Sequence, residues 1–220
     1  MAEPRDRTFR ALVVDYGGVL TTSLIASFGQ FCASVGIQPD TLRTLFGGAY
    51  GAEGGPAGFA ELIPQLETGK LALDEFDRRL AAALSEGLAE PLEPAGLSYR
   101  FFEGVQPEAA MLDAVRRAGR AGLKTGLITN TWGEVAAAHD LTGLFDVEVR
   151  SGEEGLRKPD PEIYRLAADR LGVPPEECVF VDDIPANVEG ARAVGMWAIL
   201  HRDPAITIPK LEDVLGTELS

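Results

Sequence analysis

The second half of the chain alternates between short apolar runs and segments in which apolar residues recur at helical spacing. The apolar runs predict strands at residues 123–129, 145–149, 178–181 and 197–200, and a similar run near the start of the chain predicts a strand at residues 11–14. The helical spacings predict helices at residues 107–121, 133–139, 161–171 and 187–194. Runs that are apolar throughout are typical of strands buried on both faces, and strands that alternate with helices form βαβ units. The pattern therefore predicts an α/β fold with a parallel sheet flanked by helices.

A long stretch after the first strand, residues 22–97, shows a different pattern. Its apolar residues form four stripes at helical spacing, within residues 23–35, 39–46, 59–66 and 73–84. Glycine-rich residues 47–58 and a cluster of proline and glycine at residues 91–96 stand between or after these stripes. An all-helical block after the first strand predicts a discontinuous core, residues 1–21 and 98–220, with residues 22–97 inserted as a helical cap.

The composition excludes several classes of partner. Of the 220 residues, 45% are hydrophobic and 25% are charged, which is ordinary for a soluble globular protein, and the net charge is −14. Such acidity without a long basic block argues against binding to nucleic acid or to an anionic membrane surface. No apolar run approaches the roughly 18 residues that span a bilayer, and residues 1–10 are too polar for a secretory signal. We expect a cytoplasmic protein, monomeric or homodimeric, with Cys32 and Cys178 as reduced thiols.

Acidic residues stand directly after two of the predicted strands. Asp15 follows the first strand, and Asp182 and Asp183 follow the strand at residues 178–181. Ligand sites of α/β sheets lie beyond the carboxyl ends of the strands, where these residues would meet. A strand-end aspartate often caps a turn, but it can also be a nucleophile that forms a covalent intermediate. Adjacent carboxylates repel unless a cation or hydrogen bonds compensate, so the pair is either a magnesium site or a solvated acidic turn.

Further polar residues are predicted at the same edge of the sheet. Thr129 ends a predicted strand, and Asn130 directly follows it. The two residues could either bind an oxyanion or phosphate or form an ordinary turn. Lys158 precedes Pro159 in a stiff loop and is a candidate to neutralise phosphoryl charge, although most lysines are solvated. Asn187 could orient the loop after the acidic pair or cap the next helix.

The order of these residues resembles the signature of the haloacid dehalogenase superfamily, in which a strand-end Asp is followed by Thr or Ser, then Lys, then an acidic pair. The resemblance covers nearly the whole chain, and the helical block stands where many members carry a helical cap. Within the superfamily the chain is similar in particular to the N-terminal phosphatase domain of soluble epoxide hydrolases and its bacterial relatives. Three segments carry that similarity: Ile128-Thr129-Asn130-Thr131-Trp132, Arg157-Lys158-Pro159-Asp160-Pro161-Glu162-Ile163-Tyr164 and Val179-Phe180-Val181-Asp182-Asp183-Ile184-Pro185-Ala186-Asn187. The resemblance implies a Rossmann-like core and a Mg²⁺-dependent phosphatase that works through an aspartyl-phosphate on a small phosphorylated molecule.

The resemblance also implies a role for each candidate residue. The catalytic residues would be the nucleophile Asp15 and Lys158. The phosphate-binding residues would be Thr129, Asn130 and Lys158. The magnesium ligands would be Asp15, the main-chain oxygen of Gly17, Asp182 and Asp183. Asn187 would support the acidic pair, of which Asp183 is expected to be a direct ligand.

The sequence departs from the family pattern at Gly17. Phosphatases of this family usually carry a second aspartate at this position, which protonates the leaving alcohol and then activates water. Because a positioned acid–base group contributes about 10²–10⁴-fold to the rate, we expect altered chemistry here. A leaving group that needs no proton, an acid from the cap such as Glu53 or Glu61, or a carbon–halide substrate would each compensate. Two alternatives stay open: a 2-haloacid dehalogenase-type hydrolase, and a catalytically impaired module that binds a phosphorylated ligand or a protein.

Overall fold

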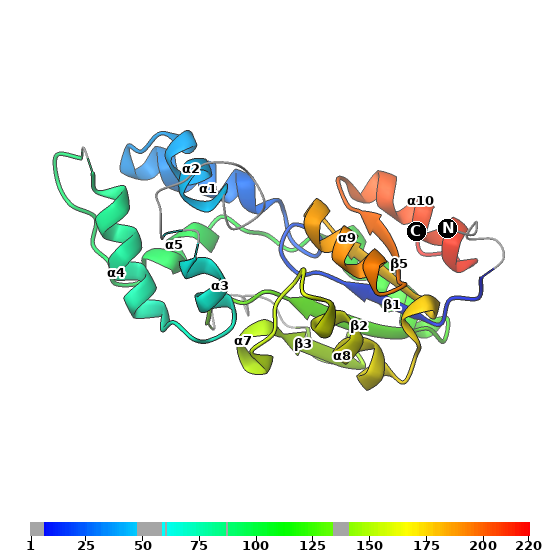
Figure 1. Cartoon of the computed structure of the whole chain (residues 1–220). Coiled ribbons are helices and arrows are strands. Elements are labelled where there is room, and N and C mark those ends of the chain that lie inside the picture. Colours follow the sequence, from blue (N-terminus) through cyan, green and yellow to red (C-terminus); the bar gives the residue numbers. More distant parts are fainter. Residues whose placement is uncertain (1–6, 48–58, 60, 87, 134–140) are drawn as a thin grey trace.

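The sheet is the centre of the fold in the computed structural model, which describes residues 7–47, 59, 61–86, 88–133 and 141–220 (Figure 1). Its strands are β1 (Ala11–Val14), β2 (Lys124–Thr129), β3 (Val147–Arg150), β4 (Cys178–Asp182) and β5 (Trp197–Leu200). They pair in parallel in the order β3-β2-β1-β4-β5, which confirms the predicted fold class. Because β1 lies between β2 and β4, Asp15, which follows β1, stands between the residues that follow β2 and β4.

Helices cover both faces of the sheet. They are α6 (Ala109–Arg120), α8 (Pro161–Leu171), α9 (Pro185–Ala193) and α10 (Pro204–Leu215). The short α7 (Ser151–Glu154) directly follows β3, and a 3₁₀ turn lies at Pro175–Glu177. Successive residues of β1 point to opposite faces, as in any strand. Leu12 and Val14 pack with α6 and α10, whereas Ala11 and Val13 pack with α8 and α9. All four residues are fully buried, which explains why the strand is a continuous apolar run in the sequence.

A second group of helices, here called the helical layer, lies beyond the carboxyl end of β1 (Figure 1). It consists of α1 (Leu24–Val35), α2 (Pro39–Gly47), α3 (Leu62–Glu67), α4 (Leu73–Leu84) and α5 (Leu97–Phe102). Its core is rich in aromatic residues, and Trp132, from the loop after β2, is buried in it. The Trp132 ring lies 5.6 Å from that of Phe46 and 5.1 Å from that of Phe76, centroid to centroid, in edge-to-face arrangements. The loop after β2 is therefore anchored in the helical layer.

Three helices of the structure, α5, α7 and α10, are absent from the sequence-based prediction. α10 has Pro204 in its first turn and Pro209 inside it, and proline inside a pattern normally argues against a helix. Asp203 stabilises the start of α10, since its carboxylate accepts a hydrogen bond from the Ala205 N–H at 2.7 Å. α5 and α7 have only six and four residues, too few for helical spacing to be recognised. The helix predicted at residues 133–139 falls on residues that, Gly133 apart, lie outside the described part of the chain.

Both cysteines are buried and unpaired, Cys32 in α1 and Cys178 in β4. Burial, reinforced by the nearby Glu177 carboxylate, raises the pKa of the Cys178 thiol to about 12. A thiol that stays protonated is a weak nucleophile, so Cys178 acts as a small core residue. Among the helices of the described residues, none combines the length and apolar character that crossing a bilayer requires.

Candidate active site

The Lys158 ammonium joins the carboxyl ends of three strands. Lys158 stands in the loop before α8, and its side chain is only 1% exposed. The ammonium donates hydrogen bonds to Asp15 Oδ1 at 2.5 Å, to Asp182 Oδ2 at 2.8 Å and to the Ile128 main-chain oxygen at 2.9 Å. These acceptors belong to the ends of β1, β4 and β2. Since an ammonium has three N–H donors, all of them are used and the charge is fixed in place.

The two adjacent aspartates at the end of β4 differ in how their oxygens are used. Asp182 accepts hydrogen bonds from the Ile184 N–H at 2.8 Å and from Asn187 Nδ2, which is 3.1 Å from both carboxylate oxygens. Asp183 has a buried Oδ1 without a hydrogen-bond partner within the described residues. One oxygen from each of Asp15, Asp182 and Asp183 lies within 4.8 Å of the other two. A buried carboxylate oxygen without a donor is costly, so this cluster fits a bound cation.

Asn130 holds the main chain of Lys158 from the loop after β2. Its Oδ1 accepts a hydrogen bond from the Lys158 N–H at 2.9 Å, and its Nδ2 donates to the Lys158 main-chain oxygen at 3.0 Å. Nδ2 also donates to Glu67 Oε2 at 3.1 Å. Thr129, the preceding residue, is buried at the end of β2. Predicted residues from four separate segments of the chain are thus neighbours at one edge of the sheet.

Among the described residues, the carboxylates of the site outnumber its cations, which are Lys158 and, near Asp183, Arg202. Burial raises the pKa of Asp15 to about 8, with Lys158 opposing this effect and the carboxylates of Asp182 and Asp183 adding to it. Burial, followed by the Asp182 charge, raises the pKa of Asp183 to about 6. Burial also acts to lower the pKa of Lys158, but the Asp15 and Asp182 carboxylates outweigh it and the pKa is raised. One ammonium therefore faces three carboxylates, a set that a divalent cation would complete.

Two glycines shortly after Asp15 differ in what a side chain there would meet. At Gly17 a Cβ would lie 2.9 Å from Leu24 Cδ1, the end of a flexible side chain. Gly18 has a φ of 76°, and a Cβ there would collide with the Asp183 carboxylate, so only glycine suits this position. Of the two acids proposed to replace the absent aspartate, Glu61 is exposed and directly precedes α3, and Glu53 lies outside the described residues.

Two charged residues next to the site, Glu67 and Arg157, are not candidates in the sequence-based prediction. Arg157 Nε donates to Glu67 Oε2 at 2.7 Å, and their side chains are 13% and 1% exposed. Tyr164, on α8, donates its hydroxyl to the Asn187 main-chain oxygen at 2.8 Å. Glu67 directly follows an apolar stripe, and periodicity alone does not distinguish a buried carboxylate from a solvated one. No sequence signal would have identified it.

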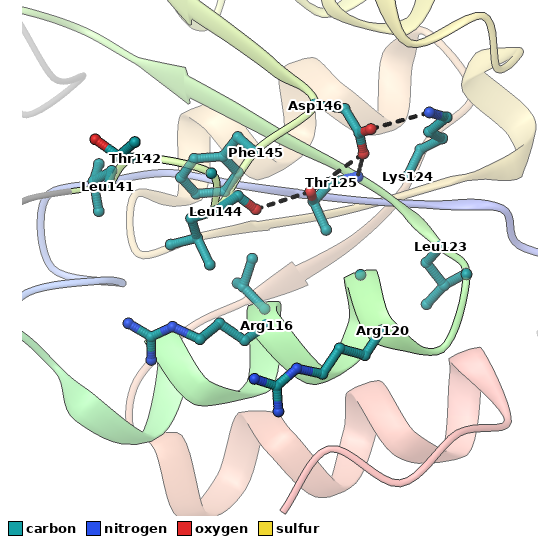
Figure 2. Close-up of a pocket in the computed structure, with 14 residues that line it drawn as sticks. Arg116, Arg120, Leu123, Lys124, Thr125, Leu141, Thr142, Leu144, Phe145 and Asp146 are labelled. Carbon is teal, nitrogen blue, oxygen red and sulfur yellow. Dashed lines mark hydrogen bonds and ion pairs between the residues drawn. The ribbon is translucent and has the colours of Figure 1, made fainter.

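A cavity of about 590 Å³ lies at the other edge of the sheet, between α6 and residues 141–146 (Figure 2). Its lining includes Arg116 and Arg120 of α6 and Lys124, the first residue of β2. Lys124 Nζ lies 3.0 Å from Asp146 Oδ1, and Figure 2 shows the two side chains joined as an ion pair. Because parallel strands begin at this edge and end at the edge that carries Asp15, the cavity is not part of the candidate site.

Comparison with known proteins identifies the family. The family model for haloacid dehalogenase-like hydrolases matches residues 9–195. The bifunctional epoxide hydrolase 2 of Mus musculus is 30% identical over 95% of this chain, which spans only 39% of that enzyme's length. A phosphatase of Mycobacterium tuberculosis is 39% identical over 58% of this chain and 60% of its own length.

Solved structures share the fold. A protein of Porphyromonas gingivalis, described as a predicted haloacid dehalogenase-like family hydrolase, superposes with a TM-score of 0.71 at 24% identity, over 96% of this chain and all of its own. A haloacid dehalogenase family enzyme of Bacteroides thetaiotaomicron, in complex with magnesium and inorganic phosphate, has a TM-score of 0.59 at 19% identity, over 88% of this chain and 94% of its own. At these identities the likeness concerns the arrangement of strands and helices.

Proposed function

This chain belongs to the haloacid dehalogenase-like hydrolase family, and from that premise we propose that it is a Mg²⁺-dependent phosphatase that acts on a small phosphorylated substrate through an aspartyl-phosphate at Asp15. The observation that carries this proposal is the Lys158 ammonium 2.5 Å from Asp15, within the cluster that contains Asp183 Oδ1, an oxygen with no hydrogen-bond partner in the part of the chain that the structure describes. A nucleophile, a cation fixed beside it and a free metal-binding oxygen are the parts that phosphoryl transfer through an enzyme carboxylate needs. The mycobacterial relative, which is named as a phosphatase, supports the same reaction class.

We propose that Asp15, Asp183 and the main-chain oxygen of Gly17 hold the metal ion. Mg²⁺ prefers oxygen ligands, and Asp183 Oδ1 has no other partner within the described residues. Asp182, by contrast, already accepts hydrogen bonds at both oxygens from neighbouring groups, so its role is to hold those groups in place. When bound, Mg²⁺ supplies Lewis-acid polarisation of a phosphoryl oxygen and compensates the carboxylate charge.

In the proposed reaction an Asp15 oxygen attacks the phosphorus, and the bond to the leaving oxygen breaks with its electron pair on that oxygen. Lys158 offsets the negative charge of the transferring group. The Thr129 hydroxyl, at the end of β2, donates to a phosphoryl oxygen. Both amide hydrogens of Asn130 already have acceptors, so Asn130 contributes by holding Lys158. Water then attacks the phosphorus of the acyl phosphate, which releases phosphate and regenerates Asp15.

We propose that the helical layer is the cap that covers this site. α5 packs against α1 and α4, and Leu97 and Phe101 are fully buried in the core of the layer, so we include α5 in the proposed cap and move its end beyond residue 97. Thr21 and Pro107 form a β-bridge where the chain leaves β1 and returns toward α6. We accordingly place the cap at residues 22–106.

Hydrolysis of p-nitrophenyl phosphate tests the proposed function. We expect turnover in the presence of Mg²⁺ and a fall on the order of 10²-fold when the metal is removed with EDTA, because a bound metal stabilises transition-state charge by several kcal/mol. p-Nitrophenolate departs without a proton, so the reaction does not need the acid that is absent at Gly17. The measurement is the initial rate of nitrophenolate release with EDTA and after Mg²⁺ is restored.

Other results would contradict this assignment. Equal turnover in EDTA would exclude the metal from the reaction. Metal-independent release of halide from 2-haloacids, without phosphatase turnover, would identify a dehalogenase-type hydrolase. Tight binding of inorganic phosphate without any turnover would identify a binding module.

The metal site has a separate test, the substitution Asp183→Asn. Because it removes the negative charge of a proposed metal ligand, we expect the Kd for Mg²⁺ to rise about tenfold or more, which is about 1.4 kcal/mol. Isothermal titration of the protein with MgCl₂ measures this change. Asp169→Asn, on the exposed face of α8, is the matched control and should leave the Kd unchanged. Equal affinities in the two variants would remove Asp183 from the proposed ligand set.

A further inference from the structure

Glu67, the last residue of α3, brings a buried carboxylate from the helical layer onto the core. Its Oε2 accepts hydrogen bonds from Arg157 Nε at 2.7 Å and from Asn130 Nδ2 at 3.1 Å. Its main-chain oxygen accepts from Ser151 Oγ at 2.5 Å. A buried carboxylate carries a desolvation penalty of several kcal/mol unless it is paired and hydrogen-bonded. Arg157, Asn130 and Ser151 belong to the core, so these contacts stabilise Glu67 in this position when the layer is docked on the core.

Asn130 connects Glu67 to Lys158. A carboxylate only accepts hydrogen bonds, so Glu67 favours the amide orientation in which Nδ2 faces it. In that orientation Nδ2 also reaches the Lys158 main-chain oxygen at 3.0 Å, and Oδ1 reaches the Lys158 N–H at 2.9 Å. The flipped amide would place its oxygen against the carboxylate and the carbonyl. Glu67 thus favours the single amide orientation that holds the main chain of Lys158 on both sides.

The residues that follow Asn130 are also tied to the helical layer. The Thr131 N–H donates to Ser151 Oγ at 2.8 Å, and that hydroxyl in turn donates to the Glu67 main-chain oxygen. Trp132 is buried in the aromatic core of the layer. Three successive residues of the loop after β2 therefore depend on the layer for their placement, either directly or through one hydroxyl.

We propose that Glu67 is a positioning residue for Lys158: by fixing the Asn130 amide, it sets the Lys158 main chain and hence the place of the ammonium at Asp15. This inference rests on the proposed function in one respect, that Lys158 acts in phosphoryl transfer. The ammonium lies 2.5 Å from Asp15 and 2.8 Å from Asp182, and a displacement of about 1 Å in such a contact can cost on the order of 10²-fold in rate. The helical layer then takes part in assembling the reaction centre.

Asp77, in α4, provides a matched control. Its side chain is buried and accepts hydrogen bonds from the Ser98 N–H at 3.0 Å and from the Ser98 hydroxyl, both within the helical layer. Glu67→Ala and Asp77→Ala each remove one buried carboxylate from the layer. Only the Glu67 carboxylate contacts the core. A general loss of stability in the layer would therefore appear in both variants, whereas a displacement of Lys158 would appear in Glu67→Ala alone.

The exchange rate of the Lys158 main-chain amide reports its placement without any turnover. In Glu67→Ala we expect this amide, measured by NMR, to exchange about tenfold faster or more, because its acceptor on Asn130 is no longer fixed. We expect kcat for p-nitrophenyl phosphate to fall on the order of tenfold or more, with KM within about threefold, since a displaced Lys158 affects mainly the transition state. Glu67→Gln keeps an oxygen that can accept from Asn130 and should recover most of both losses. Asp77→Ala should leave the exchange rate and kcat within about threefold of the wild-type values.

The same change in Lys158 amide exchange in both alanine variants, or no change in either, would overturn the proposal. If the alanine variants do not fold, Glu67→Asp, whose shorter side chain withdraws the carboxylate from Asn130, and Asp77→Asn make the same comparison, with exchange about tenfold faster in the former alone as the supporting result. A wild-type protein without Asp15-dependent turnover would contradict the proposed function. The exchange measurement would still decide whether Glu67 positions Lys158.

Discussion

Asp15→Asn is expected to abolish phosphatase turnover while the protein remains folded. The carboxylate supplies the attacking oxygen in the proposed reaction, and a neutral amide is a far poorer nucleophile. We expect kcat for p-nitrophenyl phosphate to fall on the order of 10³-fold or more, as the loss of an enzyme nucleophile generally causes. The initial rate at saturating substrate and Mg²⁺ measures this effect. The substitution preserves the shape of the side chain and an oxygen that can accept from Lys158.

The stability of this variant separates lost chemistry from lost structure. Burial holds the pKa of Asp15 well above its usual range, so the ionised carboxylate is a cost to the folded protein that the amide does not carry. We therefore expect no fall in Tm. Acid-quenched wild-type protein should carry one phosphoryl group on the peptide that contains Asp15, and the variant should not. Undiminished turnover in Asp15→Asn would exclude Asp15 as the nucleophile.

The strand ends explain why much of this site could be predicted from the sequence. Asp15, Thr129 and Asp182 each end or follow an apolar run, and the carboxyl ends of neighbouring parallel strands necessarily meet at one edge. Once the runs are interpreted as strands, the proximity of these residues follows from topology. The same holds for the core helices, whose apolar stripes face the sheet.

Contacts between the helical layer and the core could not be predicted in this way. The Glu67 carboxylate pairs with Arg157, 90 residues later in the chain, and no local pattern encodes that pairing. The division of labour between Asp182 and Asp183 is equally hidden, because it depends on where the Ile184 N–H and the Asn187 amide point. Adjacent residues of one type look alike in a sequence and acquire different roles only through their three-dimensional neighbours.

Gly17→Asp is expected to raise the hydrolysis of alkyl phosphates steeply. An alkoxide leaving group needs a proton as the bond to phosphorus breaks, and a positioned carboxylic acid supplies about 10²–10⁴-fold in rate. The hydrolysis rate of p-nitrophenyl phosphate should rise much less, since p-nitrophenolate leaves unprotonated when the phosphoryl group is transferred to Asp15. The structure admits the side chain: Gly17 does not have a positive φ, and its Cβ would press only on the flexible end of Leu24.

The decisive measurement is the gain in rate for an alkyl phosphate relative to the gain for p-nitrophenyl phosphate, and Gly17→Asn is the matched control. That variant adds nearly the same volume against Leu24 but cannot donate or accept the proton in the same way. We expect kcat/KM for an alkyl phosphate, relative to p-nitrophenyl phosphate, to rise in Gly17→Asp and to stay at the wild-type ratio in Gly17→Asn. Leu24→Ala combined with Gly17→Asp should widen the gain if crowding by Leu24 turns the new carboxyl away from the substrate. The same ratio of kcat/KM values in Gly17→Asp and Gly17→Asn, both with Leu24 and with Leu24→Ala, would contradict the prediction. It would mean that the acid comes from elsewhere in the protein or that the natural leaving group needs none.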